Sequence, residues 1–144
     1  MFELFTARAR RCIFFARQSA TKYGSPTIET EHLLLGIVQE DANVIERFFS
    51  SKTAKEIRAE VENCLTKTNA STSVEIPLSL PCKRILAYAA EEAERLRTHR
   101  HIAIDHLLLG MVREEDGMAG QILRSAGLEV AAMRQHLRET TPDR

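Results

Sequence analysis

The pentapeptide His-Leu-Leu-Leu-Gly occurs twice in this chain, at His32–Gly36 and again at His106–Gly110. The copies lie 106 − 32 = 74 residues apart in a chain of 144 residues, so each repeat unit takes up about half of the sequence. An internal repeat constrains the fold strongly, because both copies must form the same supersecondary unit. Two copies are too few for an open solenoid and therefore favour one closed domain with a pseudo-twofold axis.

Cap residues and apolar spacing predict the same helices in both copies. Thr6 and Ser79 are good N-cap residues, and each precedes a stretch whose apolar residues recur at helical steps. A second helix is predicted to open near Thr30 and near Ile104 and to carry the pentapeptide. Shorter helices are expected at about 43–49, 53–66, 118–126 and 129–139. The prediction is an all-α fold of about eight helices in two tandem four-helix repeats.

We expect a single globular domain over residues 1–144. Repeat one covers about 2–66 and repeat two about 79–140, and the polar, proline-containing segment at about 67–78 is predicted to link them. Balanced charge, with 20 basic and 20 acidic residues, argues against nucleic acid or a membrane surface as a partner. No apolar run approaches the roughly 20 residues that span a bilayer.

The three cysteines, Cys12, Cys64 and Cys82, are odd in number and show no C-x-x-C spacing. This usage favours a reducing cytoplasm over a disulfide framework, and no signal peptide is recognised at the start of the sequence. Each cysteine lies among apolar positions of a predicted helix. All three are therefore predicted to be small core residues.

The glycine and the histidine of the pentapeptide invite separate interpretations. A glycine inside a helix costs about 1 kcal/mol relative to alanine, so its presence in both copies predicts the close approach of another helix. His32 and His106 are predicted to cap a neighbouring backbone group, with catalysis or metal binding as the alternatives.

A metal site and an enzymatic activity both find little support. His99 and His101 form a workable ligand pair near His106 and His136, but no cysteine or carboxylate is spaced to complete a tetrahedral set. Two arginines interleaved with the first two histidines favour a solvated loop. No G-x-S-x-G or H-E-x-x-H motif occurs. We expect no metal, no cofactor and no catalysis.

The order of motifs resembles the Clp N-terminal repeat domain, which heads the Clp-family AAA+ unfoldases as two tandem copies. A capping Thr, an Ala-x(3)-Ala helix, Gly, Ile, Thr-Glu-His and Leu-Leu-Gly carry the resemblance, which extends from about Phe2 to Leu137. The phosphate loop G-x(4)-G-K-[ST] that ATP hydrolysis in this class requires is absent. The resemblance implies a non-enzymatic domain that docks substrate or adaptor proteins, with Clp unfoldase or protease subunits as further partners. The alternative is a structural accessory that attaches to a Clp assembly and modulates it without binding substrate.

The resemblance also implies a ligand pocket. In Gram-positive members the domain recognises phosphoarginine, which needs a carboxylate facing its guanidinium and a donor-rich site for its phosphate. Glu31 falls where the family places the guanidinium-binding carboxylate. Thr6 and Thr30 fall at the adjacent hydroxyl-bearing helix starts, where a helix N-terminus favours an anion.

The matching positions in the second copy are Asp105, Ser79 and Ile104. Asp is one methylene shorter than Glu, and Ile104 removes a hydroxyl. Glu29 and Ala103 replace the glycine that the family prefers before this motif, and Glu29 adds negative charge beside the proposed phosphate site. The first site is thus predicted to be chemically complete but crowded by charge, and the second to be depleted. Helix capping and the helix dipole explain the same residues without any ligand.

Overall fold

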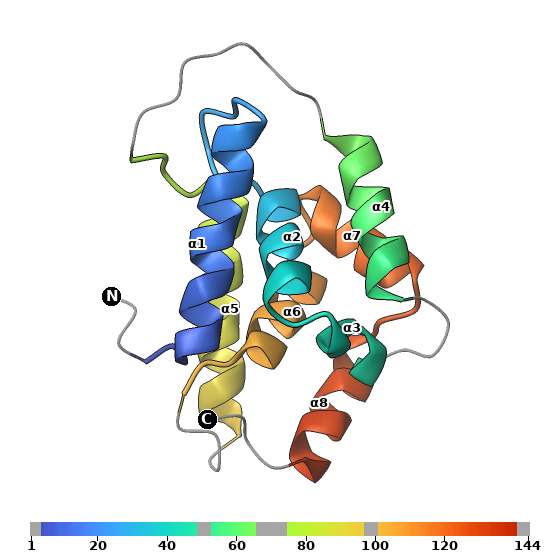
Figure 1. Cartoon of the computed structure of the whole chain (residues 1–144). Helices are drawn as coiled ribbons and strands as arrows, with labels where there is room; N and C mark the ends of the chain where they lie inside the picture. Colours follow the sequence, from blue (N-terminus) through green and yellow to red (C-terminus); the bar gives the residue numbers. More distant parts are fainter. Residues whose placement is uncertain (1–3, 49–52, 66–74, 97–100, 141–144) are drawn as a thin grey trace.

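The structure is a computed structural model and describes residues 4–48, 53–65, 75–96 and 101–140. Within these residues it contains eight helices, and its only strand-like features are two isolated bridges. The first copy forms α1 (Ala7–Lys22), α2 (Thr30–Glu40), α3 (Asn43–Phe48) and α4 (Ala54–Cys64). The second copy forms α5 (Leu80–Arg95), α6 (Ile104–Arg113), α7 (Met118–Ser125) and α8 (Val130–Glu139). The predicted all-α fold of two four-helix repeats is confirmed (Figure 1).

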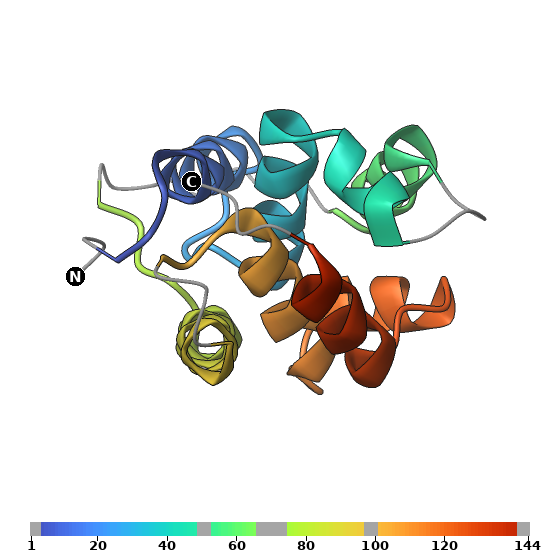
Figure 2. The same ribbon diagram turned by 90° about the horizontal axis from the view of Figure 1, so that it is seen from below.

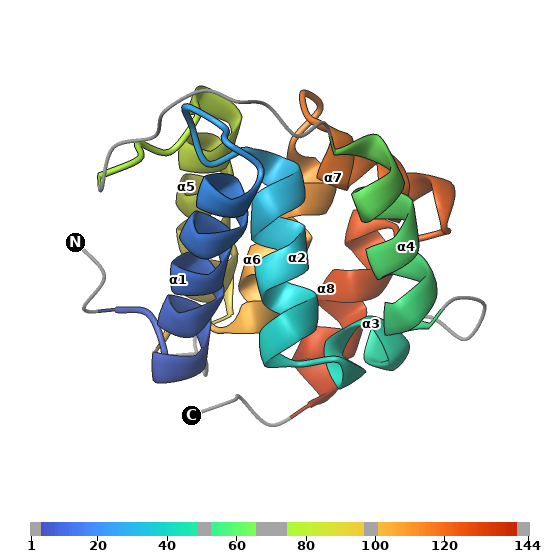
Figure 3. The ribbon, with the colours of Figure 1, turned by 45° about the horizontal axis from the view of Figure 1, so that its top comes forward.

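The two copies pack as two layers, which are separated most clearly in Figure 2. Within each copy the first two helices form the main contact, α1 with α2 and α5 with α6. Between the copies α2 contacts α5, α6 and α7, and α4 contacts α7 (Figure 3). The apolar stripes predicted on the second helix of each copy are fully or almost fully buried at Leu33, Leu34, Ile37, Val38, Leu107, Leu108, Met111 and Val112. The described helices include none that is both long and apolar enough to cross a bilayer.

The predicted N-caps are confirmed. The hydroxyl of Thr6 accepts a hydrogen bond from the backbone N–H of Ala9 at 3.1 Å, and that of Ser79 accepts one from Cys82 at 3.3 Å. Each cap satisfies one of the N–H groups that a helix start leaves without an intrahelical partner. Helix α7 starts differently, because Gly117 stands at its N-cap with a φ of 115° and provides no side-chain cap.

Close helix approach explains the pentapeptide glycines. A Cβ added to Gly110 would lie 2.7 Å from the carbonyl oxygen of Ile85, and one added to Gly36 would overlap the carbonyl oxygen of Cys12. No side chain fits between backbones at this spacing, so the loss of helix propensity is offset by the tight packing of α6 on α5 and of α2 on α1. The packing interpretation of both glycines is confirmed.

The prediction that all three cysteines are core residues is wrong for one of them. Cys12 and Cys82 are fully buried, whereas Cys64 is exposed in the last turn of α4. The apolar periodicity of α4 rests on Ala54, Ile57 and Val61, and Cys64 continues that spacing beyond the end of the buried stripe. Most of the predicted linker at 67–78 lies outside the described residues, so only its last four residues can be placed.

A buried carboxylate ties the second copy together. Glu92 of α5 is fully buried, and Arg134 of α8 contacts its two oxygens at 2.9 and 2.7 Å. Arg113 of α6 donates to Glu92 at 2.9 Å, and Arg95 lies 3.5 Å away. Burial acts to raise the pKa of Glu92, but the hydrogen bonds and charges of the three arginines outweigh burial and hold that pKa below its usual value. The ionised carboxylate therefore connects three helices.

Candidate functional site

Glu31 lies in the first turn of α2, at the place where α2 and α5 begin side by side. Ile28, just before α2, donates its backbone N–H to the carbonyl of Pro77 at 2.8 Å and accepts from the N–H of Ser79 at 3.0 Å. Short loops before both helices therefore run parallel to each other. This pairing places Ser79, the cap of α5, beside the start of the helix that carries Glu31.

Charge effects on Cys82 support the same proximity. Burial, with a smaller contribution from the carboxylates of Glu29 and Glu31, raises the pKa of the Cys82 thiol to about 12 against the opposing hydrogen bond from Ser79. Two carboxylates of the first copy thus act on a side chain in the first turn of α5. The start of α5 and the start of α2 share one electrostatic environment.

The predicted grouping of Thr6 with Glu31 is wrong. The N–H of Thr6 donates to the carbonyl of Ile102 at 3.0 Å, so Thr6 lies beside the loop that leads to Asp105. Arg8, two residues on, pairs with Glu40 at the far end of α2 from Glu31. Each hydroxyl cap therefore lies beside the start of the second helix of the other copy, because α1 runs antiparallel to α2 and α5 antiparallel to α6 (Figure 1). Ser79 belongs with Glu31, and Thr6 belongs with Asp105.

Thr30 has an internal role. It is buried, and its hydroxyl accepts from the backbone N–H of Ala119 at 3.3 Å while donating to Glu31 at 3.3 Å. A Cβ on Gly117 would lie 2.7 Å from that hydroxyl, which explains why glycine precedes α7. The Thr30 hydroxyl thus joins the first turn of α2 to the start of α7 and helps to orient the Glu31 carboxylate.

Asp105, the counterpart of Glu31, is neutralised by an arginine of the first copy. Nη2 of Arg47 lies 2.7 Å from Oδ1 of Asp105, and Nη1 of Arg47 lies 3.2 Å from Asp41. Burial acts to lower the pKa of Arg47, but these two carboxylates raise it. Gln121 stands at the equivalent position of the second copy, since 121 − 47 = 74.

Glu31 has no such neutralising partner in the described part of the chain. Its carboxylate accepts a hydrogen bond from the Thr30 hydroxyl, and no basic side chain among the described residues forms an ion pair with it. The half-buried carboxylate is therefore open to a cationic group from outside the chain. The two copies differ at this point, and Gln121 in place of Arg47 is the sequence signal of the difference.

The donors available for a phosphate at the Glu31 end are fewer than the sequence indicated. Pro81 has no backbone N–H, and the N–H of Cys82 is already bonded to the Ser79 hydroxyl. The N–H of Leu80 remains, together with the exposed Lys83 one turn into α5. The side chain of Glu29 is held by the hydroxyl of Thr27 and keeps its negative charge nearby.

The histidines of the two pentapeptides, His32 and His106, are structural caps. Nδ1 of His32 accepts from the N–H of Glu29, and Nδ1 of His106 accepts from the N–H of Ala103, each at 2.9 Å. Burial lowers the pKa of His32, which keeps the imidazole neutral so that Nδ1 can accept. The capping interpretation is confirmed. The described residues contain no cluster of three or more His, Cys, Asp or Glu suited to a metal ion, and His99 lies outside them.

Each four-helix copy places the capped start of its first helix beside the start of the second helix of the other copy. This arrangement defines an all-helical double-repeat domain. The sequence profile described as "Clp repeat (R) N-terminal domain" matches residues 4–126 and 84–143, and the chain belongs to this family. The matched region is the non-catalytic N-terminal domain of Clp chaperones, and the ATPase modules are not part of this sequence.

Relatives agree with this assignment. The chain is 34% identical over 139 residues to an ATP-dependent Clp protease ATP-binding subunit ClpA homolog of Cyanidium caldarium and 36% identical over 136 residues to the chloroplastic chaperone protein ClpC2 of Oryza sativa subsp. japonica. These alignments cover 95% and 93% of this chain but only 16% and 15% of the relatives, so the chain spans about one sixth of their length. Because some relatives are chloroplastic, the cytoplasmic location stays a prediction.

Solved structures show the same fold. The N-terminal domain of the chaperone ClpD from Arabidopsis thaliana superposes with a TM-score of 0.73 at 31% identity, covering 95% of this chain and 99% of that one. The Hsp104 N-terminal domain from Candida albicans superposes with a TM-score of 0.74 at 20% identity, covering 95% and 91%.

Proposed function

We propose that this chain is a non-enzymatic docking domain of the Clp system, which receives substrate or adaptor proteins at the Glu31 end. The observation that carries the proposal is the difference between the two copies. Asp105 is paired with Arg47 at 2.7 Å, whereas the half-buried Glu31 has no basic partner among the described residues. An unpaired carboxylate at a helix start, held by a threonine hydroxyl, suits the guanidinium of an arginine side chain.

A phosphoarginine-type pocket is the finer form of this proposal. The guanidinium would face Glu31, and the phosphate would lie at the start of α5, where the N–H of Leu80, the Ser79 hydroxyl and the exposed Lys83 offer donors. The missing N–H of Pro81 and the charge of Glu29 weaken the phosphate part. We therefore expect phosphoarginine to bind, with only a modest preference over free arginine.

Calorimetric titration with free phosphoarginine tests the pocket. We expect saturable binding by the unmodified protein and a loss of about tenfold or more in affinity in Glu31→Gln, since a charge-assisted hydrogen bond contributes about 1.5–3 kcal/mol. Asp105→Asn is the matched control and should leave the affinity unchanged, because Arg47 already occupies that carboxylate. Absence of saturable binding in the unmodified protein would refute the phosphoarginine pocket.

Protein docking needs a separate measurement. The domain, immobilised from either the unmodified chain or Glu31→Arg, would be exposed to lysate from the source organism, and retained proteins would be identified by mass spectrometry. Clp substrates or adaptors retained by the unmodified chain and lost with the charge reversal support docking at Glu31. Retention of the same proteins by both chains would place docking elsewhere on the domain.

A further inference from the structure

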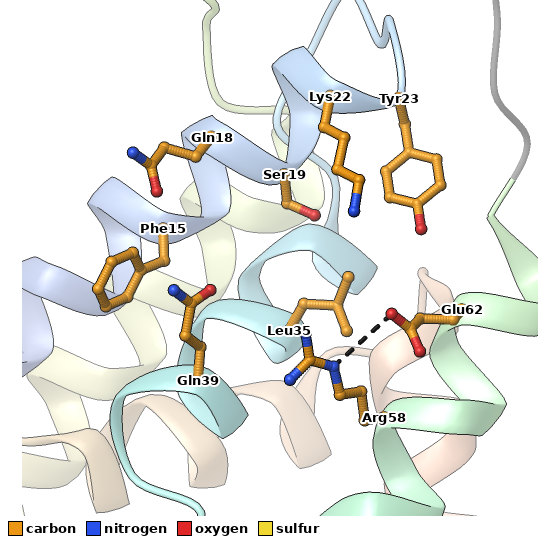
Figure 4. A pocket seen from close by; sticks show the side chains of 9 residues that line it. All are labelled: Phe15, Gln18, Ser19, Lys22, Tyr23, Leu35, Gln39, Arg58 and Glu62. Carbon is orange, nitrogen blue, oxygen red and sulfur yellow. Dashed lines mark ion pairs between the residues drawn. The ribbon is translucent and has the colours of Figure 1, made fainter.

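A groove lined by polar side chains and by Phe15, Tyr23 and Leu35 lies between α1, α2 and α4, away from the helix starts that carry Glu31 and Asp105. It encloses about 170 Å³ and is lined by Ser19 and Lys22 of α1, Gln39 of α2, and Arg58 and Glu62 of α4, among others. Figure 4 shows the Arg58 guanidinium inside the groove, facing the side chains of α1 and α2. The described interactions give Arg58 one ion pair, a 3.6 Å contact with Glu62 on the same helix.

The corresponding place in the second copy is filled. Helices α1 and α5 are related by an offset of 73, α2 and α6 by 74, and α4 and α8 by 76, which aligns the N-caps at 53 and 129 as well as the buried residues Ile57 with Met133 and Val61 with Leu137. With these offsets, 92 − 19 = 73 and 134 − 58 = 76. The groove residues therefore correspond to the residues around Glu92, in the pairs Ser19 and Glu92, Lys22 and Arg95, Gln39 and Arg113, and Arg58 and Arg134.

Two substitutions, at Ser19 and Gln39, distinguish this place in the first copy from its counterpart in the second. In the second copy Nε and Nη2 of Arg134 donate to the two oxygens of the Glu92 carboxylate at 2.9 and 2.7 Å, so a carboxylate of the chain itself occupies this place. In the first copy Ser19 stands in place of Glu92, while Arg58 keeps the cation of Arg134. The first copy thus retains the cations Arg58 and Lys22 but lacks a carboxylate at the position of Glu92, and the acidic side chain that lines the groove is Glu62 of α4.

We infer that the groove between α1 and α4 binds an acidic side chain of a partner protein, whose carboxylate takes the place that Glu92 holds in the second copy. Arg58 would hold it as a fork, and Lys22 would supply a second cation. The hydroxyl of Ser19 and the amide of Gln39 would complete the donor set. The pair between Arg58 and Glu62 is exposed and long, and it leaves donors of the guanidinium free for a second carboxylate.

The test is a titration of isotope-labelled protein with the peptide acetyl-Gly-Glu-Glu-Gly-amide, followed by amide and arginine side-chain NMR shifts. We expect saturable shifts at Ser19 and Arg58 that are absent with the glutamine version of the peptide. Arg58→Gln should abolish the shifts, whereas Lys55→Gln, which removes an exposed charge from the same helix, should retain them. Equal shifts with both peptides, or shifts that survive Arg58→Gln, would overturn the inference.

A variant that places a carboxylate in the groove on the chain itself allows a second measurement, of thermal stability. Ser19→Glu supplies the carboxylate on the same chain and is expected to raise Tm above that of Ser19→Gln, which has similar volume but no charge. It should also block the peptide-induced shifts. A Tm no higher than that of Ser19→Gln would contradict the equivalence with Glu92.

The inference is independent of the Glu31 pocket. Glu31→Gln should leave the acidic peptide bound, and Arg58→Gln should leave phosphoarginine binding unchanged. Free acetate added at the same carboxylate concentration distinguishes a protein side chain from a small carboxylate. Competition by acetate at equal concentration would show a simple anion site and overturn the assignment to a partner protein.

Discussion

The Glu92 cluster gives the sharpest test of how the second copy is stabilised. Glu92→Gln keeps the shape of the side chain but removes the charge that faces Arg134 and Arg113. Breaking a buried ion pair costs about 3–5 kcal/mol when the remaining charge stays buried. Because the arginine side chains are 26% and 21% exposed, they can turn toward water, and the expected cost is lowered to about 2–3 kcal/mol. For a domain of this size, that corresponds to a fall in Tm of about 5–10 °C.

Urea unfolding followed by circular dichroism measures this difference directly. The matched control is Glu91→Gln, since Glu91 is 58% exposed and contacts the same Arg113 at 3.0 Å. That change should cost about 0.5 kcal/mol or less. If the two variants lose the same free energy of unfolding, the buried network does not stabilise the fold as argued.

The pH dependence of the same variant has a definite sign. The arginines hold the pKa of folded Glu92 below its unfolded value, so its contribution to stability is fully present above the unfolded pKa of about 4.3 and is lost as the pH falls through the folded pKa. The unmodified protein should therefore lose stability more steeply below about pH 4.5 than Glu92→Gln. Parallel pH profiles would refute the assigned pKa shift.

Three further changes probe other features. Gly110→Ala should destabilise the domain by about 1–3 kcal/mol in denaturant unfolding, since the added Cβ lies 2.7 Å from the carbonyl of Ile85; an unchanged midpoint would contradict the close helix contact. A thiol reagent should label Cys64 rapidly in the native protein and the two buried cysteines only after unfolding, and fast labelling of all three would contradict their burial. Arg47→Gln should free Asp105 and raise the stoichiometry of phosphoarginine binding from one to two, and a stoichiometry of one in that variant counts against the second site.

Local features of the fold were predictable from the sequence, because they depend on local chemistry. The caps at Thr6 and Ser79, the buried stripes and the close approach at both glycines follow from residues within one helix or its neighbour. The exposed Cys64 was misjudged because periodicity does not show where the packing partner of α4 ends. The burial of Glu92 carried a signal, since it lies on the same face as Ala89 and Leu96.

The composition of the candidate site was harder to predict. Aligning the copies shows which residues are equivalent, but it does not show which residues of different copies meet. The contact of Ile28 with Ser79 and that of Thr6 with Ile102 join residues far apart in the sequence, and only the antiparallel course of the first two helices brings them together. For that reason the sequence grouped Thr6 with Glu31, whereas the structure places Ser79 beside the start of the helix that carries Glu31.

The backbone bonds that join the helix starts of the two copies also indicate the evolutionary origin of the domain. Thr6 is equivalent to Ser79, and Ile28 is equivalent to Ile102, so the two backbone bonds at 3.0 Å are the same bond made in both directions. This reciprocity is the defining property of an isologous twofold interface between identical subunits. A single copy could make this backbone bond only by pairing with a second copy of itself. The domain therefore has the architecture of a homodimer whose subunits have been fused into one chain, and the later divergence at Ser19, Arg47 and Glu92 is what a fused pair permits and a symmetric dimer forbids.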